Sequence, residues 1–176
     1  RDVSYLAGDA ELIGSKIVRV TTGSGETTEL EFDHAILATG SRPVWPSKLL
    51  VESDFVWDST KALEVPVVPE SLLVVGGGYI GLELGSVYAT LGSAVTVVEK
   101  TDGLLPGVDR DLTAVVARRL SAICNDVLLE TNVTTLTEDG DGVMVTLEGP
   151  ALGQFTRRFD RVLVAVGRAP NSDIPG

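Results

Sequence analysis

The feature that most constrains the fold of this chain is a glycine-rich turn between an apolar run and a helical pattern. Residues 72–75 are apolar, and glycines follow at Gly76, Gly78 and Gly81. Apolar residues then recur at the three- and four-residue spacing of one helix face. They are Ile80, Leu84, Val87 and Leu91. This order predicts a strand, a tight turn and a helix.

A second apolar run follows the predicted helix and ends on an acid. Residues 94–98 are predicted as a strand, with Glu99 directly after it. Strand, glycine turn, helix, strand and acid together form a dinucleotide-binding fingerprint. We expect Gly76 to turn the chain, Gly78 to let a pyrophosphate approach the backbone, and Gly81 to let the helix lie close to the sheet. N–H groups of the first helical turn would face the phosphates, and Glu99 would accept hydrogen bonds from both ribose hydroxyls.

The composition excludes several classes of partner and site. A formal net charge of -11 argues against nucleic acid and anionic membranes. The single cysteine, Cys124, excludes a disulfide framework, and with only His34 beside it no metal site is expected. We expect Cys124 to be packed in a helix and His34 to lie on a surface strand. No apolar run reaches the roughly 18 residues of a membrane span. Because Arg1 begins mid-pattern without a signal peptide, we expect a cytoplasmic piece of a longer chain.

The other elements are predicted from apolar spacing and from turn residues. Strands are expected over residues 3–6, 10–20, 27–32, 35–38, 127–129, 133–136, 143–147, 155–159 and 162–166, with a hairpin turn at 138–142. Residues 44–64 are predicted as a linker, in which Ser59 would cap a short helical turn. Asp109 is predicted as the N-cap of a second long helix. The apolar face of that helix would carry Leu112, Val116, Leu120 and Ile123.

An internal repeat predicts two copies of one structural unit. Residues 32–43 align with residues 159–170 at a constant offset of 127 residues, and five of the twelve positions are identical. The glycine turn at Gly76 precedes the second copy, whereas no such turn precedes the first. We therefore expect a parent protein with two dinucleotide-binding domains, of which this chain keeps the end of the first and nearly all of the second. The alternative is that short apolar strands ending in glycine recur by chance.

Four motifs resemble those of the pyridine-nucleotide disulfide oxidoreductase family. They lie at residues 38–43, 76–83, 104–109 and 166–171, in the order the family has them. Within this family the chain is most similar to the dihydrolipoamide dehydrogenases. The resemblance implies an FAD enzyme that oxidises a dithiol through a disulfide and the flavin, and reduces NAD. It also implies a homodimer that works in a 2-oxo acid dehydrogenase complex with a lipoyl-bearing protein.

The fold expected from both lines of reasoning is α/β. Residues 65–170 would form a Rossmann-like three-layer NAD-binding domain with a β-meander. Residues 1–43 would be the incomplete, β-rich C-terminal part of an FAD-binding domain, and residues 171–176 would begin the return into it. Without its partner strands, the first part should expose apolar surface, with self-association or partial disorder as the consequence.

The resemblance also implies binding roles for individual residues. The NAD contacts would be Gly76, Gly77, Gly78, Tyr79, Ile80, Gly81, Glu83, Glu99, Val133 and Gly167, and the FAD contacts would be Ala10, Thr39, Gly40 and Ser41. Glu83, in the first helical turn, would lie near nicotinamide and flavin, Val133 would pack on adenine, and Gly167 would approach the nicotinamide. Simpler roles stay open: Glu83 as an acid favoured by the helix dipole, Val133 as ordinary core, and Arg168 as the support of a turn.

Several family features are absent from residues 1–176: the redox cysteine pair, the flavin-domain glycine fingerprint and the His–Glu pair for substrate protons. We therefore expect this chain alone to be inactive and not to hold FAD tightly. Glu99 and Asp102 would repel a 2′-phosphate, so NAD is expected over NADP. Two alternative functions remain open. One is another reductase of the family, for mercuric ion or glutathione, and the other is a non-catalytic NAD-sensing module.

Overall fold

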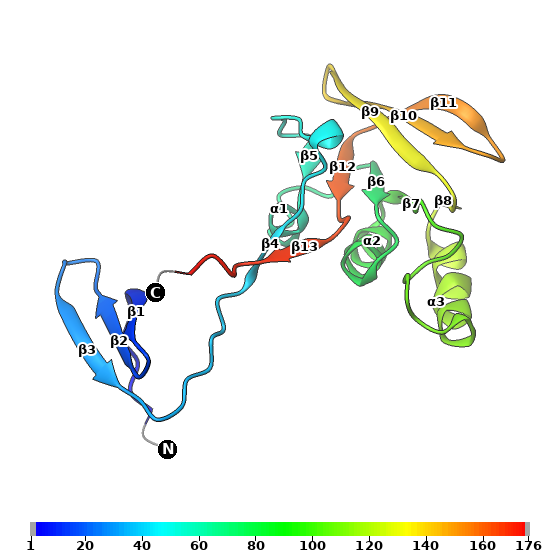
Figure 1. Ribbon diagram of the computed structural model, residues 1–176. Helices are drawn as coiled ribbons and strands as arrows, with labels where there is room; N and C mark the ends of the chain where they lie inside the picture. The colour runs from blue at the N-terminus through cyan, green and yellow to red at the C-terminus, as the bar shows by residue number, and fades with distance from the viewer. Residues whose placement is uncertain (1–2, 175–176) are drawn as a thin grey trace. The chain divides into compact units, whose positions relative to one another are not determined.

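The computed structural model describes residues 3–174, which fall into two units (Figure 1). Unit 1 holds the residues up to Arg42 together with those from Pro170 onward, and unit 2 holds Pro43–Ala169. Unit 2 is therefore inserted in the sequence of unit 1. Among residues 3–174, no helix has the length and apolar character that crossing a membrane requires.

The centre of unit 2 is a parallel sheet with the strand order β5–β12–β6–β7–β8. Its strands are β5 (Val56–Trp57), β6 (Ser71–Val75), β7 (Ala94–Val98), β8 (Asp126–Leu128) and β12 (Arg161–Val164). All four pairs of neighbouring strands are parallel. The chain goes from β6 to β7 on one side and reaches β12 on the other. The carboxyl end of β6 is therefore a topological switch point, the place where α/β sheets bind ligands.

Two apolar layers cover the two faces of this sheet (Figure 1). Successive strand residues point to opposite faces, so Leu73 and Val75 face one layer while Leu72 and Val74 face the other. One layer is formed by the helices α1 (Ser59–Leu63), α2 (Tyr79–Leu91) and α3 (Arg110–Ile123). The other is the meander of β9 (Asn132–Asp139), β10 (Gly142–Gly149) and β11 (Gly153–Phe159). The predicted three-layer α/β arrangement is confirmed.

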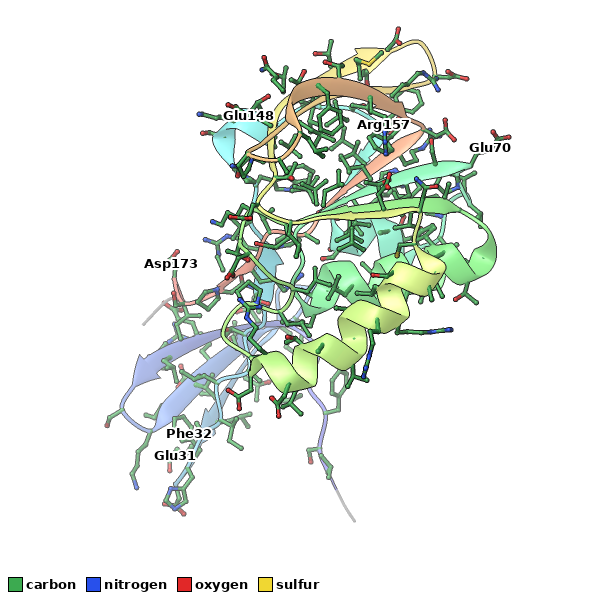
Figure 2. All side chains as sticks on the ribbon, turned by 90° about the vertical axis from the view of Figure 1, so that its right-hand side faces the viewer. Glu31, Phe32, Glu70, Glu148, Arg157 and Asp173 are labelled. Atoms are coloured by element: carbon green, nitrogen blue, oxygen red, sulfur yellow. The ribbon has the colours of Figure 1, made fainter. Side chains whose placement is uncertain are left out.

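An ion pair joins the meander to the edge of the sheet. Arg157 of β11, labelled in Figure 2, places its Nη1 2.7 Å from Oδ2 of Asp126 in β8.

The hairpin between β9 and β10 turns at residues 140–141, which is narrower than the predicted turn over 138–142. Both strand pairs of the meander are antiparallel, with one register shift between β9 and β10 at residues 146–147.

The buried face of α2 differs from the predicted one. Val87 and Leu91 are about half exposed, whereas Gly81, Gly85 and Tyr88 are buried together with Leu82 and Leu84. A Cβ on Gly81 would lie 3.0 Å from Val74, so the two glycines let the helix approach the sheet closely. The buried face thus combines two glycines with the apolar residues Leu82, Leu84 and Tyr88, which pack in the same layer as the sheet residues. The second helix, α3, begins after Asp109 as predicted, but its Leu112 is exposed.

The predicted linker over residues 44–64 is wrong, because this stretch belongs to the core of unit 2. It contains the 3-10 turn η1 (Ser47–Leu49), β5 and α1. Its buried side chains include Leu49, Trp57 and Ala62. The N-cap of α1 is Asp58, whose Oδ1 accepts a hydrogen bond from Lys61 N at 2.9 Å, and Ser59 is the first helical residue. Three prolines within residues 44–70 suggested a linker, but β5 pairs with the distant strand β12.

Unit 1 is built on an antiparallel sheet in the order β1–β2–β3. The strands are β1 (Asp9–Gly14), β2 (Ile17–Thr21) and β3 (Thr27–Glu31). A turn at residues 15–16 splits the predicted strand over 10–20 into β1 and β2. The predicted strands over 3–6 and 35–38 are wrong: both segments are irregular and exposed, and His34 is exposed outside any strand. A buried parallel strand needs neighbours on both edges, and the described residues of unit 1 supply none for residues 35–38.

Equivalent ends of the internal repeat pair with one another. Two short strands, β4 (Ser41–Pro43) and β13 (Arg168–Pro170), form a two-stranded ribbon. Asn171 N donates to Gly40 O at 3.0 Å, and Val44 N donates to Gly167 O at 3.0 Å. The two bonds are counterparts in the repeat, because Asn171 corresponds to Val44, and Gly167 to Gly40, at the 127-residue offset. Both glycines have positive φ, 76° for Gly40 and 145° for Gly167.

Candidate functional site

A pocket of about 800 Å³ lies at the carboxyl edge of the parallel sheet, and unit 2 alone forms its wall. The wall includes the last residues of β6 and β7, the first residues of α2, the start of β9, the segment after β12 and the turn η1. The pocket therefore occupies the switch point at which ligand binding is expected.

Glycine is favoured at three positions in and just after the turn that follows β6, each for a different structural reason. Gly76 has φ 113°, and a Cβ there would overlap the carbonyl oxygen of Ala165. A Cβ on Gly81 would overlap the carbonyl oxygen of Gly76. Gly78, the N-cap of α2, has an ordinary φ of -79°, and no atom lies within 4 Å of the position of a Cβ. Folding explains the first two glycines, and the open space beside Gly78 fits a ligand that approaches the backbone.

The start of α2 presents backbone N–H groups to the pocket. Tyr79 and Ile80 line the wall, and no side chain caps this end of the helix. N–H groups in the first turn of a helix have no partner within the helix and favour anions. Glu83 lies beyond the first turn, which contains no acid, and it is exposed and outside the wall. The predicted placement of Glu83 in the first turn is therefore wrong.

Glu99 is the buried acid of the pocket, with 6% of its surface exposed. Its Oε2 accepts a hydrogen bond from Gly77 N at 2.7 Å, and its Oε1 accepts from Thr101 N at 2.9 Å and Thr101 Oγ1 at 2.8 Å. Burial raises the pKa of this carboxyl, but these three hydrogen bonds and the charge of Lys100 outweigh burial and leave the pKa below its ordinary value. Glu99 is therefore ionised at neutral pH.

The same carboxylate changes what the glycine turn can offer a ligand. Gly77 N–H donates to Glu99 and is not directed at the pocket, and Gly77 does not line the wall. A carboxylate has about four acceptor positions, of which the protein fills three. One position therefore remains for a ligand hydroxyl, whereas the sequence predicted bonds to two.

The loop after β7 packs against the glycine turn. Leu105 N donates to Gly77 O at 2.8 Å, and Leu105 itself has a positive φ of 52°. Arg110 holds this loop, with Nη2 at 2.8 Å from Asp102 Oδ1 and Nη1 at 3.3 Å from Leu104 O. Asp102 thus carries a paired charge and lies outside the wall, so Glu99 is the acid that a ligand meets there.

Some of the other predicted site residues line the pocket, and others do not. Val133 and Gly167 lie at the wall, and Val133 also packs against the meander layer. Gly81 is buried under the helix and does not reach the wall. The wall also carries three cations that sequence reasoning gave no ligand role, Lys48, Lys100 and Arg168. Arg168 Nη1 donates at 3.2 Å to Oγ of Ser59, the first residue of α1, a contact between distant parts of the sequence.

The four predicted FAD contacts do not share a pocket in the described part of unit 1. Ala10 lies in β1, whereas Thr39, Gly40 and Ser41 precede or begin β4. The Thr39 hydroxyl donates to Asn171 O at 2.6 Å, and Asn171 Nδ2 donates to Thr39 O at 2.9 Å. The pocket in unit 1, beside Leu12, Phe32 and Leu37, includes none of the four. These residues alone do not build a flavin site.

The described residues hold no obvious metal site. No group of three or more His, Cys, Asp or Glu side chains within residues 3–174 could hold a metal ion. Cys124, directly after α3, is partly buried at the edge of the helical layer, as its position predicted, and burial raises the pKa of its thiol.

Comparison with protein families and curated proteins gives consistent matches. The family described as pyridine nucleotide-disulphide oxidoreductase matches residues 3–175. Dihydrolipoyl dehydrogenase from Vibrio parahaemolyticus is 42% identical over 174 residues, which cover 99% of this chain and 36% of that protein. Dihydrolipoyl dehydrogenase from Haloferax volcanii is 42% identical over 173 residues, 97% of this chain and 36% of that protein. The chain thus spans about a third of the length of these relatives.

Solved structures show the same fold. LpdA from Mycobacterium tuberculosis superposes with a TM-score of 0.75 at 30% identity, over 96% of this chain and 37% of that chain. The HOCl-induced flavoprotein disulfide reductase RclA from Escherichia coli superposes with a TM-score of 0.73 at 30% identity, over 94% and 36%. Both match across the two units described above.

Proposed function

The chain belongs to the pyridine nucleotide-disulphide oxidoreductase family, and we propose that it forms the NAD-binding part of a dihydrolipoamide dehydrogenase. The observation that carries this proposal is the 42% identity to proteins of that name over nearly the whole chain. The parent enzyme would oxidise a dithiol by way of a disulfide and FAD, and would reduce NAD. A disulfide needs two cysteines and residues 1–176 contain one, so the redox pair would lie elsewhere in the parent.

The wall of the pocket offers a suitable group for each part of NAD. The open backbone at Gly78 and the first turn of α2 would hold the diphosphate. Glu99 would accept a hydrogen bond from one ribose hydroxyl, Val133 would pack on adenine, and Gly167 would lie toward the nicotinamide. When bound, NAD supplies the ring that accepts a hydride. The contribution of this chain is to bind and orient the dinucleotide.

The charge of the pocket favours NAD over NADP. Glu99 is ionised because its hydrogen bonds lower its pKa. A 2′-phosphate beside this buried carboxylate would meet a like charge in a partly desolvated place. Arg110, a cation that might have offset this repulsion, is held by Asp102 in the loop after β7. We expect NADH to bind more tightly than NADPH.

The binding part of the proposal is tested by calorimetry on the 176-residue chain. We expect NADH to bind, and Gly78→Val to abolish binding without changing the melting temperature, because the new side chain fills open space at an ordinary φ. The matched control is Gly23→Val, in an open turn of unit 1, which should change neither property. Equal or tighter binding of NADPH would contradict the NAD preference, and unchanged NADH binding by Gly78→Val would contradict the site.

The catalytic part of the proposal is tested on the full protein that contains this chain. We expect that protein to be yellow and to reduce NAD with dihydrolipoamide, and we expect the 176-residue chain alone to be colourless and inactive. Turnover of glutathione disulfide or mercuric ion with a nicotinamide donor would support the rival reductases. NAD binding without any redox turnover of the full protein would support a sensing module.

The proposal extends to partners and place in the cell. As a dihydrolipoamide dehydrogenase, the full protein would be a cytoplasmic homodimer that associates with a lipoyl-bearing protein of a 2-oxo acid dehydrogenase complex. Sedimentation of the full protein tests the dimer, and co-purification with a lipoylated protein tests the complex. A monomer, or a preparation that never carries a lipoylated protein, would contradict these assignments.

A further inference from the structure

Two of the four lysines of this chain line the pocket and two do not. Those that do not are Lys16 and Lys61, and the Nζ of each forms an ion pair with a carboxylate oxygen, at 3.4 and 3.2 Å respectively. The other two, Lys48 and Lys100, lie at its wall. Neither of these two forms an ion pair or side-chain hydrogen bond within residues 3–174.

Lys48 is the more isolated of the two lysines at the wall. The charge of Lys100 lowers the pKa of Glu99, so Lys100 already acts on a neighbouring carboxylate, and Lys48 has no such effect. The chain has 25 acidic side chains against 14 arginines and lysines. In a chain so rich in acids, a cation without a carboxylate partner, placed at the wall of a pocket, is available to an anionic ligand.

The backbone of Lys48 is held in place by its neighbours. Lys48 belongs to the turn η1, in which Leu49 N donates to Pro46 O at 2.8 Å. The side chain of Leu49 is buried in the layer that contains Val75 and Val98, the last residues of β6 and β7. The turn is thus anchored to the strand ends that form the pocket, while the side chain of Lys48 stays exposed. An anchored base lowers the entropic cost of binding a ligand.

We propose that Lys48 binds the diphosphate of the dinucleotide, an assignment that rests on the proposed function and adds a residue to it. The same pocket contains the N–H groups at the start of α2, which favour the same anion. A 2′-phosphate would instead lie beside Glu99, whose carboxyl is influenced by Lys100 and not by Lys48. The diphosphate is therefore the phosphate group that matches Lys48.

The test is the dissociation constant of NADH for the 176-residue chain and for single variants, measured at low and moderate salt. Lys48→Gln should weaken binding about five- to tenfold, as expected for one charge-assisted contact at a partly exposed site. It should also reduce the salt dependence. Lys48→Arg should bind within about twofold of the unmodified chain, because it keeps the charge. Lys61→Gln is the matched control and should bind normally, and circular dichroism confirms that each variant is folded.

Two further ligands separate the possible contacts. Adenosine, which has no phosphate, should bind equally to the unmodified chain and to Lys48→Gln. A loss confined to NADPH would place Lys48 at the 2′-phosphate and overturn the assignment, as would equal NADH binding by Lys48→Gln and the unmodified chain. Failure of the unmodified chain to bind NADH would instead overturn the proposed function, and this assignment with it.

Discussion

Residues 35–38 and residues 162–165 occupy the same positions of the internal repeat, but they differ in structure. Ile36 is 94% exposed in an irregular segment, whereas its counterpart Leu163 is 0% exposed within β12. Both segments are apolar and both end at a glycine with positive φ. The difference is in their neighbours, because β12 pairs with β5 and β6 and has an apolar layer on each face.

This contrast shows that an apolar run permits a buried strand without forcing one. Residues 35–38 have no pairing strand among the described residues of unit 1, and all four of them are exposed. Burial contributes about 25 cal/mol per Å² only when partners remove the surface from water. The repeat therefore provides matched positions at which the same change should have different consequences.

The largest difference should come from truncating the central apolar residue of each copy. Leu163→Ala leaves a cavity between two layers and should cost unit 2 about 2–5 kcal/mol of unfolding free energy. Ile36→Ala should change stability by less than about 0.5 kcal/mol, because the side chain is already in water. Urea unfolding followed by circular dichroism measures both. Similar losses at the two positions would contradict the comparison.

A smaller difference in stability is expected at the aspartate in the second position of each copy, Asp33 and Asp160. Asp160 Oδ2 accepts a hydrogen bond from Ser71 N at 2.9 Å, at the start of β6. Asp160→Ala leaves that N–H without its partner and should cost about 1–2 kcal/mol. The counterpart Asp33 makes an exposed 3.4 Å ion pair with Lys16, so Asp33→Ala should cost less than about 0.5 kcal/mol. The same urea experiment would refute this if Asp33→Ala were the more damaging change.

The ribbon gives a third matched pair, Val44 and Asn171. Asn171 Nδ2 donates to Thr39 O at 2.9 Å, and its Oδ1 accepts from Arg42 Nη1 at 3.1 Å. Asn171→Ala should therefore destabilise the end of the ribbon next to residue 171 by about 1 kcal/mol. It should also speed hydrogen exchange of the backbone N–H of residue 171 about fivefold. Val44→Ala removes no side-chain hydrogen bond and should leave exchange at residue 44 unchanged. Equal acceleration at both ends would show that the side chain of Asn171 contributes nothing.

The smallest effect concerns the buried acid of unit 2. The folded pKa of Glu99 lies below its ordinary value of 4.5, so its hydrogen bonds stabilise the fold fully above pH 4.5. This contribution is lost as the pH falls through the lower folded pKa. The stability difference between the unmodified chain and Glu99→Gln should therefore shrink in acid. Thr101→Val removes one of those bonds and should raise the pKa of Glu99 in an NMR titration, and an unchanged pKa would refute this account.

Much of unit 2 follows from local patterns in the sequence. The strand β6, the turn at Gly76, the helix α2 and the strand β7 were predictable because spacing and glycine chemistry act over a few residues. The buried face of α2 was not, because Gly81 carries no apolar side chain to mark it. The pairing of β5 was also missed, since a two-residue strand has no periodicity and depends on β12.

The candidate site was likewise only partly predictable from the sequence. Gly78 and Glu99 have a spacing that points to the pocket, and both line it. Lys48 reaches the wall through the folding of a stretch that was predicted to be a linker, and the role of Thr101 depends on the exact position of the Glu99 carboxylate. Residues that enter a site through long-range packing leave no spacing signal, so only the three-dimensional arrangement finds them.

The ribbon of β4 and β13 has a consequence for how such proteins can be rearranged. The bond from Val44 N to Gly167 O holds the two ends of unit 2 side by side. A segment that starts and finishes at one place can be cut out, or placed in another host, without displacing the flanking chain. Because the whole pocket lies between those ends, one exchange of a continuous gene segment would carry it intact into a new scaffold.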